Sequence, residues 1–226
     1  MSDVEITHQT QDSKLYYLDY FCVGRSNEKL TVATTRPETI FADVALAVNP
    51  HDSRYTNYIG TEVIVPYSQH TIKVIADDVV DPKYGTGVLK VTPFHDPIDY
   101  EIALRHSLPL DRCAITKEGV LTNICGQYAG RQIDECYDVL IDNMNNTYIS
   151  HTETIQNNIS CCERCHTKIQ PLITTQRFVD VKDYATQVLD HIADKKITFY
   201  PPKFADSLDK RLGDIKPRCI SRQLWR

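Results

Sequence analysis

Residues 85–101, GTGVLKVTPFHDPIDYE, hold the densest group of side chains that could do chemistry. An ammonium and a hydroxyl, Lys90 and Thr92, are followed closely by two carboxylates, Asp96 and Asp99. Lys90 and Thr92 would share one face of a strand, because side chains alternate along a strand. A carboxylate beside such groups can bind a free α-amino group through charge-assisted hydrogen bonds, and we expect Asp99 to do so.

Each of these residues also has an ordinary structural interpretation. Asp96 fits the N-cap of a helix that begins at Pro97, Asp99 is a favourable charge in its first turn, and Lys90 fits a solvated strand position. For any single residue the structural interpretation is favoured. The grouping of all four within one short segment favours a binding pocket.

His95 stands next to Asp96, which invites the interpretation of a His–Asp pair that activates a water molecule. Adjacent residues on a turn point in different directions, and a lone histidine is more often a hydrogen-bonded structural group. The sequence contains no GxSxG motif, no HExxH motif and no glycine-rich phosphate loop with its lysine. We therefore expect His95 to line the site without acting as the catalyst.

A second segment, TVATTRPET at residues 31–39, places hydroxyls, a guanidinium and backbone amides where a strand meets a helix. Thr34, Thr35 and Arg36 could bind a polar ligand at that corner. The alternative is that Thr35 or Thr39 only caps the helix that follows.

Cys162 and Cys165 form a CxxC within the run CCERC. A structural zinc usually needs four ligands, often from two such pairs, and a second pair is missing. Cys161, His166 and Cys219 could contribute, but their spacing is not standard. With no export signal the eight cysteines should stay reduced, and we predict no metal site.

The elements that must position these residues are short strands, turns and brief helices. Strands are expected at residues 15–23, 29–35, 62–66, 71–76 and 87–93, where β-branched and aromatic residues are bounded by Gly, Asn, Asp or Pro. Helices are expected at residues 97–107 and 130–144, where apolar residues recur at helical spacing. The strands predict a barrel or a strongly bent sheet with flanking helices, an α+β fold.

Beyond about Ser150 the pattern changes to a helix at 181–193, a strand at 197–200, a helix at 204–212 and a final strand-like run at 218–225. The charge changes as well. Residues 1–160 hold 12 basic and 22 acidic residues, a net charge of −10, while residues 161–226 hold 13 and 8, a net charge of +5. An acidic first part argues against broad phosphate neutralisation but permits a pocket that binds only the end of an RNA.

The chain has 226 residues and is 42% hydrophobic, enough to bury a core. It contains no apolar run of the length that would span a bilayer, and its polar start could not serve as a secretory signal. We therefore expect a cytoplasmic protein that has no contact with membranes.

The segments TTRPETIFADVALAVNP and GTGVLKVTPFHDPIDYEIALRH, residues 34–50 and 85–106, resemble the insertion of class I aminoacyl-tRNA synthetases for branched aliphatic amino acids. The valyl branch matches best, because isoleucyl enzymes look more like TTTPWT and leucyl enzymes more like TTRPDT. The resemblance continues to SDVEI near the start and RCISRQLW near the end. It implies a bent β-barrel editing domain at residues 1–160, followed at 161–226 by a segment that returns to the nucleotide-binding core.

The resemblance also implies roles for individual residues. Asp99 would bind the α-ammonium of the substrate, while Asp96, Lys90 and Thr92 would test for the hydroxyl of threonine. The remaining expected contacts, to the terminal adenosine of the tRNA, the hydrolytic water and the pocket wall, come from Thr34, Thr35, Arg36, Asp81, Tyr84 and His95.

These assignments predict hydrolysis of Thr-tRNA(Val). The synthetic site of a valyl enzyme cannot strongly reject threonine, which is isosteric with valine and has a hydroxyl in place of one methyl, so a second site must destroy the product. The expected partners are the acceptor end of tRNA(Val) and threonine, and the chain is expected to be a monomer. The ATP motifs of the family are absent, so ATP and Mg²⁺ are expected only for the full-length enzyme and no cofactor for this chain.

Two alternatives remain open from the sequence. One is the same editing chemistry for a different amino acid, as in isoleucyl or leucyl enzymes. The other is a non-catalytic RNA-binding or zinc module, against which the acidic first part argues.

Overall fold

The computed structural model describes residues 6–68, 70–145 and 147–221. The chain divides into two compact units, Met1–Ile173 and Thr174–Arg226. This division lies beyond the predicted boundary at residues 160 and 161, because the first unit also includes the end of a long strand and the segment after it. The assignment of the two parts to editing and to the return segment stays a prediction. Residues 2–5 and 222–225, part of the two matching ends, lie outside the described residues.

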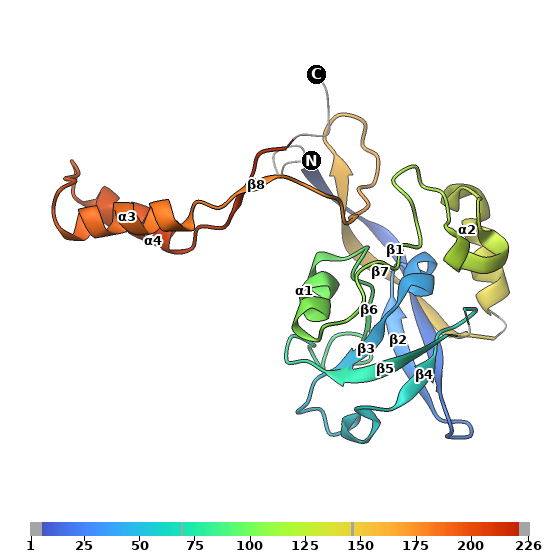
Figure 1. Cartoon of the computed structure of the whole chain (residues 1–226). Helices are drawn as coiled ribbons and strands as arrows, with labels where there is room; N and C mark the ends of the chain where they lie inside the picture. Colours follow the sequence, from blue (N-terminus) through green and yellow to red (C-terminus); the bar gives the residue numbers. More distant parts are fainter. Residues whose placement is uncertain (1–5, 69, 146, 222–226) are drawn as a thin grey trace. The chain divides into compact units, whose positions relative to one another are not determined.

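The first unit is built on a curved sheet, shown in Figure 1. Its described strands are β1 (Ile6–Cys22), β2 (Lys29–Thr34), β3 (Ala45–Val48), β4 (Glu62–Ile64), β5 (Thr71–Ala76), β6 (Val88–Val91) and β7 (Ile149–Cys162). The order is β2-β1-β4-β5-β3-β6, and β7 pairs with β1 off this path. Because β2 and β6, the two ends of the order, also contact each other, the sheet curls into a half-barrel.

Helices flank this sheet. They are α1 (Pro97–Arg105), α2 (Ile133–Asn145) and the 3-10 helices η2 (Pro37–Ala42), η3 (Thr56–Tyr58) and η4 (Asn123–Tyr128). Helix α1 packs against β6, whereas α2 packs against η2 and β7. The predicted fold class, a mixed α+β chain with a bent barrel-like sheet, is confirmed.

Strand β3 is buried on both faces and divides the core. Leu46 and Val48 belong to the larger apolar cluster, while Ala45 and Ala47 belong to a smaller one that includes Ile102 of α1. The alternation of the strand sends successive side chains to opposite clusters. The small alanines thus let α1 pack closely beside β6, the strand that carries Lys90.

The five predicted strands and the two predicted helices of the first part are all present. Two strands were missed. β3 is a short, wholly buried apolar run without alternation, which periodicity alone does not assign to a strand. β7 is largely polar and contains two adjacent asparagines, which disfavour strands. It is stabilised by its long antiparallel register with β1, from Ile6 opposite Cys162 to Leu18 opposite Ile149.

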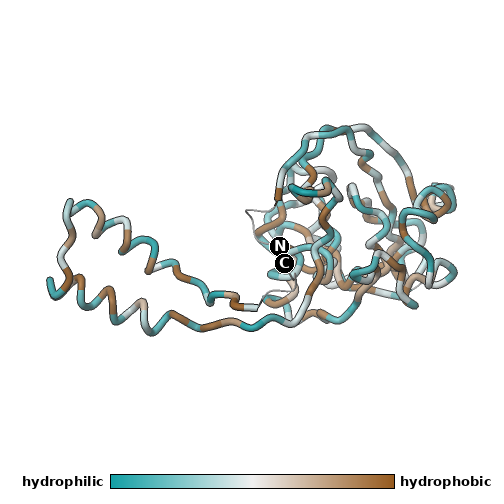
Figure 2. The backbone as a smooth tube through the Cα atoms, turned by 90° about the horizontal axis from the view of Figure 1, so that it is seen from above, coloured by the Kyte–Doolittle hydropathy of each residue, from teal (hydrophilic) through white to brown (hydrophobic). Residues whose placement is uncertain are grey.

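The second unit has helices α3 (Lys182–Ala193) and α4 (Lys203–Gly213), which pack on each other, and a short pairing of β8 (Phe178–Val179) with β9 (Arg218–Cys219). The predicted strand at 197–200 is wrong, because those residues have no ladder partner and form bends and irregular structure. Polar and apolar residues alternate along both helices in Figure 2. No helix among the described residues is long and apolar enough to cross a membrane.

Candidate functional site

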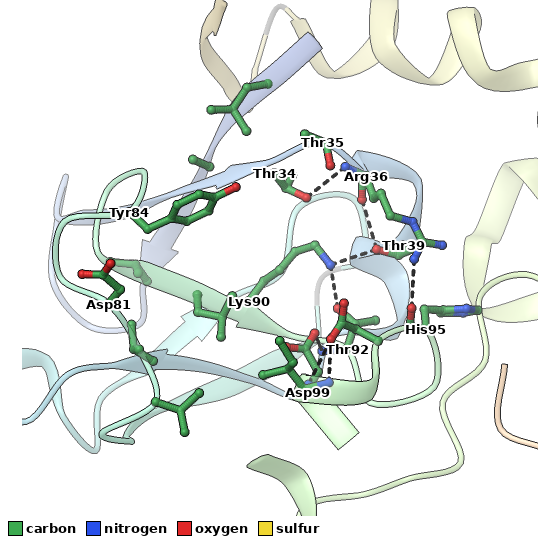
Figure 3. Close-up of a pocket in the computed structure, with 18 of the residues that line it drawn as sticks. Thr34, Thr35, Arg36, Thr39, Asp81, Tyr84, Lys90, Thr92, His95 and Asp99 are labelled. Atoms are coloured by element: carbon green, nitrogen blue, oxygen red, sulfur yellow. Dashed lines mark hydrogen bonds between the residues drawn. The ribbon is translucent and has the colours of Figure 1, made fainter. Parts of the chain in front are cut away.

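A pocket of about 420 Å³ opens in the first unit, beside β6 and the start of α1. This volume lies within the usual range of about 300–1,000 Å³ for small-molecule sites. Its lining includes every predicted site residue: Thr34, Thr35, Arg36, Asp81, Tyr84, Lys90, Thr92, His95, Asp96 and Asp99. The structure therefore brings both sequence segments to one place (Figure 3), while the roles of the individual residues stay predictions.

Five buried polar residues at the wall of the pocket are joined by hydrogen bonds. We call them the buried network: Tyr20, Thr39, Asp43, Lys90 and Thr92. Lys90 Nζ donates to Thr39 Oγ1 at 2.8 Å and to Thr92 Oγ1 at 2.6 Å. Thr92 Oγ1 in turn donates to Asp43 Oδ1 at 2.6 Å, and Tyr20 OH donates to Asp43 Oδ2 at 2.6 Å. The predicted sharing of one strand face by Lys90 and Thr92 is confirmed.

Asp43 is a residue of the buried network that sequence reasoning missed. Its side chain is fully buried, and its Oδ1 lies 3.6 Å from Lys90 Nζ, so it supplies the negative charge that a buried ammonium requires. Burial raises the pKa of Asp43, whereas Lys90 and the hydrogen bonds from Thr92 and Tyr20 act in the opposite direction. The signal available in the sequence was a charged residue between the apolar runs TIFA and VALAV.

Asp99 is 5% exposed, and its Oδ2 accepts a hydrogen bond from Thr92 N at 2.8 Å. Among the described residues none donates to its other oxygen, Oδ1. Burial raises the pKa of Asp99 to about 7, with Lys90 acting against this shift and Asp96 adding to it. A cation bound beside Asp99 would favour its ionised form.

Asp96 is the N-cap of α1, as predicted, and Pro97 stands in the first turn. Its Oδ1 accepts from Ile98 N at 2.8 Å and from Asp99 N at 3.2 Å. The cap fixes the first turn of the helix and with it the direction of Asp99. No described residue donates to Asp96 Oδ2, which leaves that oxygen available to a ligand.

Arg36 joins three segments at the edge of the pocket. Its guanidinium donates to the His95 carbonyl at 2.9 Å, to Glu38 at 3.4 Å and to the Gln170 side chain. Thr34 Oγ1 accepts from Arg36 N at 3.0 Å, so this hydroxyl shapes the corner after β2. The alternative that a threonine caps the next helix is wrong, because no side chain caps η2.

The ring of His95 is directed away from the other labelled side chains in Figure 3. Its Nε2 accepts from Ala114 N at 3.0 Å and from Ile115 N at 3.4 Å. Burial lowers the pKa of His95 to about 4, and the charges of Arg36 and Lys90 act in the same direction. The neutral imidazole thus holds the segment around Ala114 by accepting hydrogen bonds at Nε2. The contact of His95 with Arg36 is made by its backbone carbonyl.

Asp81 and Tyr84 lie on residues 80–87, which we call the rim loop. Tyr84 is 69% exposed, and two further apolar residues at the pocket, Val79 and Ile98, are more than half exposed. Gly85 has φ of +56°, and a Cβ there would lie 2.8 Å from Ala33 Cβ on β2. Glycine, which has no Cβ and adopts positive φ readily, therefore permits this close approach of the loop to β2.

The CxxC lies at the turn that follows β7. Cys162 N donates to the Thr167 carbonyl at 2.9 Å, and Cys165 Sγ donates to Thr167 Oγ1 at 3.3 Å. Hydrogen bonding to Thr167 lowers the pKa of Cys165. In the described parts of the chain, no group of three or more His, Cys, Asp or Glu residues is arranged to hold a metal ion.

The whole chain, residues 1–226, matches the family model described as tRNA synthetases class I (I, L, M and V). It is similar to the valine-tRNA ligase of Campylobacter jejuni, with 38% identity over 226 residues, and to that of Mycoplasma mycoides, with 40% over 227 residues. The valine-tRNA ligase of Thermotoga maritima is 38% identical over 231 residues. These alignments cover all of this chain.

The same alignments cover only 26% of each of those three relatives, so the chain spans about a quarter of their length. The predicted resemblance to class I synthetases, and to their valyl branch in particular, is confirmed by these matches. With the family model matched from end to end, the chain belongs to the class I tRNA synthetases.

Proposed function

We propose that the pocket hydrolyses the ester bond of Thr-tRNA(Val) and so removes threonine that a valyl-tRNA synthetase has attached in error. The observation that carries this proposal is that one pocket holds two complementary groups. They are the buried carboxyl of Asp99, which has one oxygen without a hydrogen-bond donor among the described residues, and the ammonium of Lys90, which is held in place by hydrogen bonds. The similarity to valine-tRNA ligases supports the choice of amino acid and tRNA.

Asp99 Oδ1 would accept the α-ammonium of the threonyl group. The buried carboxyl ionises with a pKa of about 7, and the arriving ammonium stabilises the ionised form by direct charge pairing. Thr92 N–H holds the second oxygen at 2.8 Å, so the carboxylate does not need to reorient when the substrate binds. This arrangement orients the amino acid relative to the wall formed by β6.

The threonine hydroxyl would be tested by Asp96 Oδ2 on one side and by the Lys90 and Thr92 groups on the other. The single proton of Thr92 Oγ1 is directed to Asp43, so this hydroxyl can only accept from a ligand. Valine offers no donor to these acceptors and would leave them desolvated without a partner. The pocket thus selects for the group that the synthetic site cannot exclude.

The reaction itself requires one water molecule. Its oxygen attacks the ester carbonyl, the bond between the carbonyl carbon and the ribose oxygen breaks, and the ribose oxygen takes a proton, giving threonine and free tRNA(Val). The positive charge of Lys90 at the pocket wall favours the negative charge that develops on the carbonyl oxygen. Positioning of the ester and water supplies the remainder of the rate.

The decisive experiment is deacylation of tRNA(Val) charged with either threonine or valine by the purified chain. We expect release of threonine at a rate far above the spontaneous rate, with valyl-tRNA(Val) almost untouched. Rapid loss of valine with retention of threonine would contradict the valyl assignment. Loss of neither would contradict the hydrolytic function of this chain.

A further inference from the structure

The rim loop carries Asp81 and Tyr84 but contains no strand or helix of its own. Its internal backbone hydrogen bonds include those from Tyr84 N to the Asp81 carbonyl at 3.2 Å and from Gly87 N to the Tyr84 carbonyl at 3.0 Å. Each of these two hydrogen bonds closes a tight turn within the loop. An exposed loop of this kind depends on outside contacts for a defined conformation.

Those contacts come from residues 49–55, NPHDSRY, which we call the support segment. Asn49 Nδ2 donates to the Val80 carbonyl at 2.8 Å, Arg54 Nη2 to the Pro82 carbonyl at 2.7 Å, and Tyr55 OH to the Thr86 carbonyl at 2.8 Å. The three acceptors are distributed along the rim loop from its start to its end. Because all are backbone carbonyls, the bonds fix the path of the loop whatever its side chains bind.

Contacts within the support segment orient the Arg54 side chain toward the rim loop. Its Nε donates to Asp52 Oδ1 at 2.9 Å and its Nη2 to Asp52 Oδ2 at 2.6 Å, and the guanidinium lies 5.1 Å from the centre of the Tyr55 ring. The planar guanidinium, held in this two-point geometry, loses little freedom on binding the Pro82 carbonyl. The fit on the loop side is close, since a Cβ at Gly87 would lie 2.5 Å from Arg54 Nη2.

We propose that the support segment, through Arg54 above all, positions the rim loop and thereby sets the affinity of the pocket for the end of the tRNA. This inference rests on the proposed function. Asn49, Arg54 and Tyr55 are absent from the pocket lining, whereas Val80, Asp81, Tyr84 and Gly87 of the rim loop form part of it. We therefore assign the three side chains as positioning residues that act through the loop.

The test compares Arg54→Ala with Arg25→Ala, a closely matched control. Arg25 also pairs with a carboxylate (Glu28, 3.1 Å), donates to a carbonyl (Asn57, 3.2 Å) and lies over a tyrosine ring (Tyr58, 5.3 Å), but it has no contact with the rim loop. For Thr-tRNA(Val) we expect Arg54→Ala to raise KM about tenfold and to leave kcat within about twofold. Arg25→Ala should leave both unchanged.

Two milder variants keep the test meaningful if Arg54→Ala folds poorly. Arg54→Lys keeps the charge but not the two-point pairing with Asp52, and its KM should fall between those of the wild type and Arg54→Ala. Tyr55→Phe removes only the hydroxyl that donates to the Thr86 carbonyl, and it should raise KM about threefold.

Hydrogen exchange of the amides of residues 81 and 83–87, measured on the same chain without substrate, separates this inference from the proposed function. We expect exchange to accelerate about tenfold in Arg54→Ala and to remain unchanged in Arg25→Ala. A wild-type chain without deacylase activity would end the proposed function, and the exchange data would still decide the positioning of the loop. Unchanged exchange in Arg54→Ala, or a loss of kcat shared equally by both variants, would overturn the inference.

Discussion

The buried network and the rim loop border the same pocket but are held in place by opposite means. In the buried network, side chains bind side chains, and both Lys90 and Asp43 are buried. In the rim loop, backbone carbonyls are bound from outside while Tyr84 remains 69% exposed. Loss of one member of a buried charge pair therefore lowers the stability of the fold. A substitution in an exposed loop can change the affinity for a ligand while the stability stays nearly the same.

The largest effect is expected in the buried network, from Asp43→Ala. This change leaves the Lys90 ammonium buried without its counter-charge and should destabilise the fold by about 3 kcal/mol, a fall in Tm of about 10 °C, with loss of deacylation. Thermal unfolding followed by circular dichroism measures it. Tyr20→Phe, which removes only one hydrogen bond to Asp43, is the control and should cost about 1 kcal/mol. If Asp43→Ala had the Tm of the wild type, the buried network would not stabilise the fold, and the contrast with the rim loop would fail.

Asp99→Ala should come next, with an effect on activity far larger than on folding. Loss of the carboxylate that we propose binds the α-ammonium should lower kcat/KM for Thr-tRNA(Val) by at least about a hundredfold. The Tm should stay near that of the wild type, since removal of a buried carboxyl also removes its desolvation. Activity retained by the variant would exclude Asp99 as the ammonium-binding residue.

The ionisation of Asp99 predicts a dependence on pH of about tenfold. Because its pKa is about 7, the ratio of kcat/KM for the wild type to that for Asp99→Asn should rise about tenfold between about pH 6 and pH 8. Taking the ratio cancels the titration of the substrate itself. A flat ratio would contradict the requirement for the carboxylate.

The same pKa has a consequence for stability. The folded state binds the Asp99 proton more tightly than the unfolded chain, so the stabilising contribution of Asp99 is fully present below about pH 4 and is lost as the pH rises through about 7. The Tm of Asp99→Asn should therefore increase relative to the wild type over this range.

Asp96 belongs to neither region: one of its oxygens caps α1, and the residue lines the pocket. Asp96→Asn should retain most of the cap and lower the preference for threonyl over valyl ester about tenfold. Asp96→Ala should in addition cost about 1 kcal/mol of stability through the lost cap. Competition between the two charged tRNAs measures the preference, and an unchanged preference in both variants would refute the hydroxyl test.

Among the residues that line the pocket, the smallest effect is expected at the rim loop, from Tyr84→Ala. If this exposed ring contacts the terminal nucleoside, its loss should raise KM about fivefold, with kcat unchanged. The Tm should change by no more than about 1 °C, because the side chain buries little surface in the free protein. A marked fall in Tm would show that the rim loop, like the buried network, contributes to the stability of the fold.

The sequence by itself determined the local geometry of the site. Alternation along a strand placed Lys90 and Thr92 on one face, and the Asp-Pro pair before α1 predicted its N-cap. Both depend on residues within a few positions of one another, where backbone periodicity fixes direction. The resemblance of two separated segments then predicted that they meet, and the structure places all of their predicted residues around one pocket.

Only the tertiary structure decided which distant residues complete that pocket. Asp43 reaches Thr92 across 49 positions, and Arg36 reaches Gln170 across 134. The donors of the support segment bind the rim loop across about thirty positions, 28 in the case of Arg54 and Pro82. No local pattern encodes such pairs, because they depend on which segments the fold brings together. The antiparallel pairing of β3 with β6, for example, brings Asp43 beside Thr92 and buries both of these polar groups.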